Sequence, residues 1–148
     1  MVIIRPATVS ERCELEALQW RASLENAEDR GFLLANPDAI SLTAEQIRAG
    51  GVFVAEVDEA IVGFAAVLPR ADGDSELDGL FVDPEQQKNG IGRALVEYCT
   101  RFARSQGSRT LHVVGNSHAE PFYRKCGFEE SGTKKTRFRP AKTFRLLL

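Results

Sequence analysis

The feature that most constrains this chain is a stretch in which an apolar strand passes through a polar loop into an amphipathic helix. It spans residues 80–95 and reads LFVDPEQQKNGIGRAL. Gly90 and Gly92 have no Cβ, so the backbone there can adopt unusual φ/ψ values and approach a ligand closely. The N–H groups at such a helix start converge on one point and carry partial positive charge. The stretch therefore predicts a seat for a phosphate or pyrophosphate group.

Composition limits what kind of protein this is. The chain has 148 residues, 43% of them hydrophobic and 27% charged, which predicts a single domain over residues 1–148. A net charge of -2 argues against nucleic acid as a partner, and no apolar run is long enough for a membrane helix. Three cysteines without CxxC spacing, and no signal-peptide pattern, predict a cytoplasmic protein with reduced thiols.

Periodicity and turn residues predict the order of the elements. Strands are expected at residues 2–6, 52–57, 60–68, 76–82, 110–114, 128–133 and 142–148. Helices are expected after a capping box at Thr8–Glu11, over 43–49, from Gly92 to Gly107 and over 118–125, while 29–42 is expected to be irregular. Helical spacing predicts a buried face made by Cys13, Ala17, Trp20 and Leu24. The order β-α-α-β-β-β-α-β-α-β-β predicts an α/β (α+β) fold with a mixed, mostly antiparallel sheet.

Two motifs together carry a family resemblance. The first, QKNGIG at residues 87–92, fits a Gln/Arg-x-x-Gly-x-Gly/Ala loop that follows a central strand. The second, NSHAEPFYRKCGF at residues 116–128, fits the pattern Asn-x-x-Ala-x-x-Phe-Tyr-x-x-x-Gly-Phe. Both stand in a strand-helix-strand-helix context. With them, the chain resembles the GCN5-related N-acetyltransferase (GNAT) family over nearly its whole length.

The resemblance implies acetyl-coenzyme A (acetyl-CoA) as the cofactor. Its pyrophosphate would lie on the glycine loop, and its pantetheine arm would add beside the central strand like an extra strand. The family splays this strand from the next one, and Gly79 fits the associated bulge. A backbone N–H near Leu80 or Phe81 would polarise the thioester carbonyl. The implied cofactor-binding residues are Leu80, Phe81, Val82, Gln87, Lys88, Asn89, Gly90, Ile91, Gly92, Arg93, Asn116 and Tyr123.

The resemblance also implies which residues move protons. An amine that attacks the thioester must lose a proton, and the leaving thiolate must gain one. Tyr123 matches the family tyrosine near the sulfur and is the expected general acid. Glu76, at the start of the central strand, is the expected base, either directly or through water. Asp78, two residues on and on the same strand face, is the alternative base.

Other reactive side chains fit structural roles better. His112 lies in a strand from which it could reach the cleft as a base, and His118 stands at the start of a helix. Cys99 and Cys126 fit buried apolar positions. No His, Cys or Asp cluster has metal-ligand spacing, so the sequence predicts no metal.

We therefore expect an acetyl-CoA-dependent N-acetyltransferase that acts on a primary amine of a small molecule or peptide. The alternatives are a protein Nα- or lysine acetyltransferase and a non-catalytic acyl-CoA-binding sensor. An ATP module is disfavoured, because Gly92 is followed by Arg93-Ala94 instead of Lys-Ser/Thr. The acceptor, the natural acyl chain and a homodimer through the C-terminal strands stay open.

Overall fold

The computed structural model describes residues 1–25, 27–87, 89–115, 119–136 and 140–148. Its strands are β1 (Ile3–Pro6), β2 (Val52–Val57), β3 (Ala60–Pro69), β4 (Ser75–Val82), β5 (Thr110–Gly115), β6 (Glu129–Lys135) and β7 (Pro140–Leu147). Its α-helices are α1 (Arg12–Leu24), α2 (Ala27–Ala35), α3 (Ala44–Arg48), α4 (Ile91–Ser105) and α5 (Glu120–Lys125). Short 3-10 turns form η1 (Val9–Glu11), η2 (Pro37–Ala39) and η3 (Pro84–Gln86).

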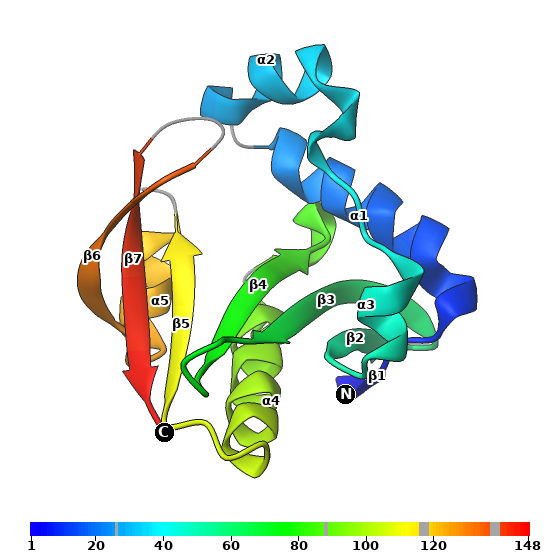
Figure 1. The fold of residues 1–148 in the computed structure, drawn as a ribbon. Coiled ribbons are helices and arrows are strands. Elements are labelled where there is room, and N and C mark those ends of the chain that lie inside the picture. Colours follow the sequence, from blue (N-terminus) through cyan, green and yellow to red (C-terminus); the bar gives the residue numbers. More distant parts are fainter. Residues whose placement is uncertain (26, 88, 116–118, 137–139) are drawn as a thin grey trace.

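The strands form one seven-stranded sheet in the order β1-β2-β3-β4-β5-β7-β6. Every neighbouring pair is antiparallel except β4 and β5, which are parallel. The predicted fold class, a mixed and mostly antiparallel sheet flanked by helices, is confirmed (Figure 1). No helix in the part of the chain that the structure describes is both long and apolar enough to cross a bilayer.

Two hydrophobic clusters hold the helices on opposite faces of the sheet. On one face, Leu95 of α4 and Tyr123 of α5 pack with strand residues such as Leu77. On the other, Leu18 of α1 and Ile47 of α3 pack with a second set of strand residues. Because the central strands are covered on both faces, they are rich in apolar residues rather than strictly alternating.

Local signals in the sequence predicted several elements correctly. The strands expected at 52–57 and 60–68 are β2 and β3, and the two residues that join them, Asp58 and Glu59, have positive φ values of 51° and 66°. This is the turn geometry that matches the twist of a two-residue hairpin. The capping box is also present: the Thr8 N–H donates to Glu11 Oε1 at 2.9 Å, and Arg5 of β1 donates to Glu11 Oε2 at 2.6 Å.

The N-terminal helices differ from the sequence prediction. The predicted buried face of α1 is wrong, because Cys13 is exposed and the fully buried residues are Leu15 and Leu18. The prediction of irregular structure over 29–42 is also wrong in part, because residues up to Ala35 belong to α2. Gly31, a residue type that usually weakens helices, lies inside that helix.

Candidate functional site

The central strands β4 and β5 pair only at their beginnings. The parallel register joins Ser75 to Leu111, Glu76 to His112 and Leu77 to Val113, and goes no further. Among the residues that the structure describes, the rest of β4 therefore has no strand partner on its β5 side, and the two strands diverge (Figure 1). This divergence leaves backbone N–H and C=O groups of β4 open to a ligand that adds as a strand.

A β-bulge lies just before the divergence. The register of β4 against β3 steps from the pair Ala66–Gly79 to the pair Val67–Leu77, which leaves Asp78 as the extra residue. A bulge changes which side chains face each side of the sheet. The predicted irregularity near Gly79 is thus present, and Asp78 is the residue that it inserts.

The bulge sets the direction of the β4 side chains. Leu80 and Val82 pack on the α4 side of the sheet, whereas Phe81 packs on the α1 side, 5.2 Å from the ring of Phe64. Just beyond β4, the N–H of Asp83 donates to the Val62 carbonyl on β3 at 2.8 Å. Because backbone groups alternate along a strand, those of Val82 and Leu80 point to the open side.

The glycine loop leads directly into α4. Gly90 is the N-cap of this 15-residue helix and adopts a left-handed conformation, with φ +77° and ψ 6°. No acidic residue lies in the first turn of α4 to neutralise its positive end. Gly92 sits where an added Cβ would be 3.2 Å from the Phe122 ring of α5. The helix start is therefore open to an anion and packed tightly against α5.

A pocket of about 740 Å³ lies between the open side of β4, the glycine loop, α5 and the end of α1. Its lining mixes apolar side chains with polar groups at the loop. The lining residues are Ala22, Glu25, Leu80, Val82, Gln86, Gln87, Gly90, Ile91, Gly92, Arg93, Ala119, Pro121, Phe122, Tyr123, Lys125 and Cys126.

Most of the predicted cofactor-binding residues meet at this pocket. Those that line it are Leu80, Val82, Gln87, Gly90, Ile91, Gly92, Arg93 and Tyr123. Phe81 and Asn89 do not line it: the Phe81 ring is on the other face, and the Asn89 amide donates to Gln86 Oε1 at 3.2 Å. Lys88 and Asn116 lie outside the described residues, as does His118.

The pocket also contains residues that sequence reasoning did not single out. Phe122 and Ala119 line it beside Tyr123, and both are named positions of the second motif, which was the available signal. Ala22 of α1 lines it from a distant part of the chain, and no local pattern could have shown that.

Tyr123 is a buried residue of the pocket lining. Its side chain is only 7% exposed, and its ring packs edge-on against Phe122 and Phe128 at centroid distances of 5.4 and 5.5 Å. Burial raises the pKa of Tyr123 well above its ordinary range. Its hydroxyl makes no hydrogen bond with any residue that the structure describes. At neutral pH the phenol keeps its proton and can donate it.

The predicted bases lie on the α1 side of the sheet, across β4 from Tyr123. Leu77 between them faces the α4 side, so Glu76 faces the opposite side, and Gln46 of α3 donates to Asp78 Oδ2 at 3.5 Å. Partial burial, and then the charge of Glu76, raise the pKa of Asp78. The two carboxylates are therefore near neighbours, as the strand spacing predicted.

Comparison with known families decides what this arrangement belongs to. Residues 48–130 match the family described as "Acetyltransferase (GNAT) domain". The chain belongs to the GNAT acetyltransferase family. The match covers β2 to β5, the glycine loop, α4 and α5, and so includes every residue of the pocket lining except Ala22 and Glu25.

Curated relatives include several proteins named as N-acetyltransferases. A peptidyl-lysine N-acetyltransferase of Salmonella typhimurium is 29% identical over 133 residues, covering 89% of this chain and 86% of that protein. An aminoglycoside N(6')-acetyltransferase of Stenotrophomonas maltophilia is 30% identical over 112 residues, covering 74% of this chain and 65% of that protein. Some relatives are longer: the chain spans between 39% and 65% of the length of four curated relatives that it matches.

Solved GNAT structures share the fold. The PaiA N-acetyltransferase of Thermoplasma acidophilum, solved in complex with coenzyme A, superposes with a TM-score of 0.81 and 16% identity, covering 100% of this chain and 99% of that one. A ribosomal-protein-alanine N-acetyltransferase of Brucella melitensis superposes with a TM-score of 0.70 and 27% identity, covering 99% of both chains.

Proposed function

We propose that residues 1–148 form one GNAT domain that transfers an acetyl group from acetyl-CoA to a primary amine of a small molecule or peptide. The observation that carries the proposal is the pocket in which the open side of β4, the start of α4 and Tyr123 converge. The reaction requires a binding site for the cofactor's phosphates, a strand edge for its pantetheine arm and a proton donor for the leaving thiolate. The pocket brings these three together.

The residues present fit the cofactor. The N–H groups of Gly90, Ile91 and Gly92 lie at the positive end of α4, where a pyrophosphate is favoured, and Arg93 adds a positive charge to the pocket lining. The open backbone groups of Leu80 and Val82 match a pantetheine arm that carries two amides. When bound there, acetyl-CoA supplies the acetyl thioester.

Tyr123 is the group that we propose as general acid. A tyrosine hydroxyl carries its proton at neutral pH, and burial raises the pKa of Tyr123 further. Tyr123 and Leu80 line the same pocket, which places a proton donor where a leaving thiolate would need one. The N–H of Leu80, which points to the open side of β4, is the donor that we propose for the thioester carbonyl.

Glu76 is the group that we propose as base, with Asp78 as its alternative. A direct amine attack requires that the ammonium form of the acceptor lose a proton before or during attack. Asp78 has a raised pKa, which makes its carboxylate a better proton acceptor than an ordinary aspartate. Either carboxylate would act from the α1 side of β4, so the acceptor would approach from that side.

The proposal has two versions, which differ in whether the acceptor amine belongs to a small molecule or to a peptide or protein. The Salmonella relative is named for peptidyl-lysine and the Stenotrophomonas relative for an aminoglycoside, so relatives of both kinds exist.

We place the protein in the cytoplasm, which is supported by its three unpaired thiols, Cys13, Cys99 and Cys126.

The test is amine-dependent release of coenzyme A, with the acetylated product identified by mass spectrometry. The panel contains diamines, aminoglycosides and lysine peptides. Tyr123→Phe should lower turnover by about 100-fold or more while acetyl-CoA affinity stays within a few-fold. Tyr98→Phe is the matched control, since the Tyr98 ring packs against Phe53 with centroids 4.8 Å apart and does not line the pocket.

Glu76→Gln and Asp78→Asn separate the two candidate bases. The variant that removes the base should lose turnover mainly at low pH, where fewer acceptor amines are already deprotonated. Acetyl-CoA binding without release for any amine would favour the sensor instead. Wild-type turnover in Tyr123→Phe would refute the acid role.

A further inference from the structure

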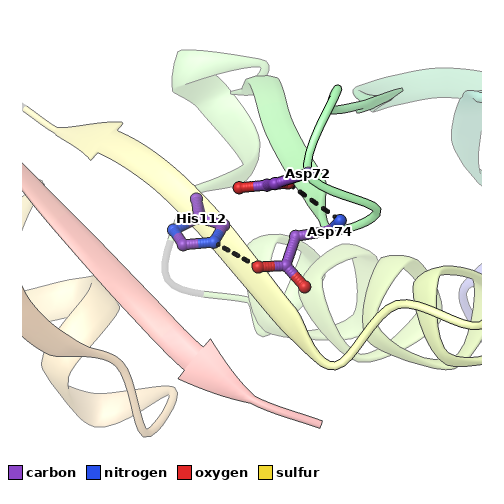
Figure 2. A group of neighbouring side chains, drawn as sticks. All are labelled: Asp72, Asp74 and His112. Atoms are coloured by element: carbon purple, nitrogen blue, oxygen red, sulfur yellow. Dashed lines mark hydrogen bonds and ion pairs between the residues drawn. The ribbon is translucent and has the colours of Figure 1, made fainter.

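A second group of reactive side chains lies at the other end of β4, away from the pocket. The loop before β4 carries Asp72 and Asp74, and both approach His112 of β5 (Figure 2). Asp74 and Val82 are eight positions apart, which at roughly 3.3 Å per residue corresponds to more than 20 Å of extended chain. Asp74 and His112 are 38 positions apart in sequence, so no local spacing could reveal the group.

The three side chains lie close to one another. His112 Nε2 lies 3.0 Å from Asp74 Oδ2. One ligand atom from each of the three residues can be chosen so that all lie within 4.8 Å of one another. In a tetrahedral site with bonds of about 2.1 Å, ligand atoms are roughly 3.4 Å apart. To bind an ion with that geometry, the exposed Asp72 side chain would have to turn towards the other two ligand atoms.

The loop that presents the carboxylates is held firmly. The Arg70 N–H donates to the Asp74 carbonyl at 2.8 Å, and Ser108 Oγ donates to the Gly73 carbonyl at 3.2 Å. Ser75 and Ser108, both buried, share a hydrogen bond of 2.7 Å between their hydroxyls. These contacts anchor the loop to the start of β5, so binding an ion would order little additional backbone.

The charge state also suits a cation. Aspartate side chains are ionised at neutral pH. The N–H of Asp74 donates to Asp72 Oδ1 at 3.0 Å, which holds the two carboxylates side by side. In the structure their charge is met in part by Arg70, which forms an ion pair with Asp72 at 3.0 Å.

We propose that Asp72, Asp74 and His112 form a binding site for a divalent transition-metal ion, with Zn²⁺ as the probe. Two carboxylate oxygens and one imidazole nitrogen are a ligand set for such ions, and water would fill the remaining positions. Mg²⁺ would bind poorly, because it prefers oxygen ligands and keeps its waters.

The site would cross-link the loop before β4 to β5. His112 is the register partner of Glu76, one pair before the strands diverge. An ion at His112 would therefore fasten the two strands at the closed end of the opening. Because it binds the folded chain and joins segments 38 positions apart, it should raise the melting temperature.

The test is calorimetric titration of the metal-free full chain with ZnCl₂, with MgCl₂ as the control ion and melting temperature as a second readout. We expect one Zn²⁺ site with a dissociation constant below about 100 μM and a higher melting temperature. Asp74→Asn and His112→Ala should each weaken binding by about tenfold or more. No Zn²⁺ binding up to about 1 mM in the wild-type protein would overturn the proposal.

Arg70→Ala provides a test that does not depend on removing a ligand. It deletes the guanidinium that competes for Asp72, so we expect Zn²⁺ to bind more tightly than in the wild-type protein. Weaker binding in this variant would overturn the proposal. So would unchanged binding in a folded His112→Ala variant, because the ion would then be held elsewhere, such as at the exposed thiol of Cys13. Neither result depends on acetyl-transfer activity.

Discussion

The two ends of α4 allow a matched test of the glycine loop. Gly90 precedes the helix with φ +77°, and Gly107 follows it with φ +84°. At both positions an added Cβ would have no heavy atom within 4 Å. Substitution by alanine therefore introduces backbone strain and no steric clash at either site, but only Gly90 lines the pocket.

The expected losses of stability are equal, because the two glycines have similar backbone conformations and surroundings. A left-handed conformation costs an alanine about 1–2 kcal/mol, and the stiffer unfolded chain returns part of this. Gly90→Ala and Gly107→Ala should therefore each lower the free energy of unfolding by about 1 kcal/mol, or the melting temperature by roughly 2–5 °C. In Gly90→Ala the loop can relieve the strain only by turning its N–H groups away from the phosphate seat. We expect its coenzyme A affinity to fall at least tenfold, equivalent to about 1.4 kcal/mol.

The assay is titration calorimetry with coenzyme A, beside thermal melts of both variants. Gly107→Ala should bind coenzyme A as the wild-type protein does, despite the same loss of stability. If the two variants bind equally well, or lose affinity equally, the glycine loop is not the phosphate seat and the reasoning is refuted.

Packing and charge elsewhere give further expectations. A Cβ at Gly63 would lie 2.9 Å from the Phe81 carbonyl oxygen, whereas a Cβ at Gly31 would have no heavy atom within 4 Å. In urea unfolding, Gly63→Ala should therefore lower the free energy of unfolding by about 1–3 kcal/mol, and Gly31→Ala should not lower it. Similar losses in the two variants would contradict this. Burial raises the pKa of the Cys99 thiol to about 12, so iodoacetamide should label it only after unfolding, and labelling of the native chain would count against its burial. Hydrogen bonds from the arginine of β1 lower the pKa of Glu11 from 4.5 to about 2, so the stability that it contributes is complete above pH 4.5 and is lost as the pH falls towards 2. Glu11→Gln should flatten the acid-side fall in melting temperature, and an unchanged slope would refute that role.

The parts of the fold that the sequence predicted are those set by local backbone chemistry. The Asp58-Glu59 turn, the capping box at Thr8 and the left-handed Gly90 each depend on a few adjacent residues. For the same reason, the glycine loop and the motif at residues 116–128 allowed most of the pocket-lining residues to be predicted from the sequence.

The parts that the sequence did not predict depend on tertiary packing. Helical spacing fits Cys13 and Ala17 as well as Leu15 and Leu18, and only the sheet beneath α1 decides which pair is buried. The cost of a glycine in a helix is small, about 1 kcal/mol, so α2 continues through Gly31.

The site shows the same division between local and distant signals. Ala22 and the Asp72, Asp74 and His112 group are assembled from distant segments, and no spacing rule identifies them. The face of β4 that each side chain occupies depends on the bulge at Asp78. From the sequence, this bulge could be predicted only to lie near Gly79.

A crystal structure of the complex with coenzyme A tests the central claim most directly. The account predicts the diphosphate within hydrogen-bond distance of backbone N–H groups between Gln87 and Gly92. It also predicts the pantetheine arm along the open side of β4 and the sulfur beside the Tyr123 hydroxyl. A diphosphate bound away from the start of α4, or a sulfur out of reach of Tyr123, would contradict the account.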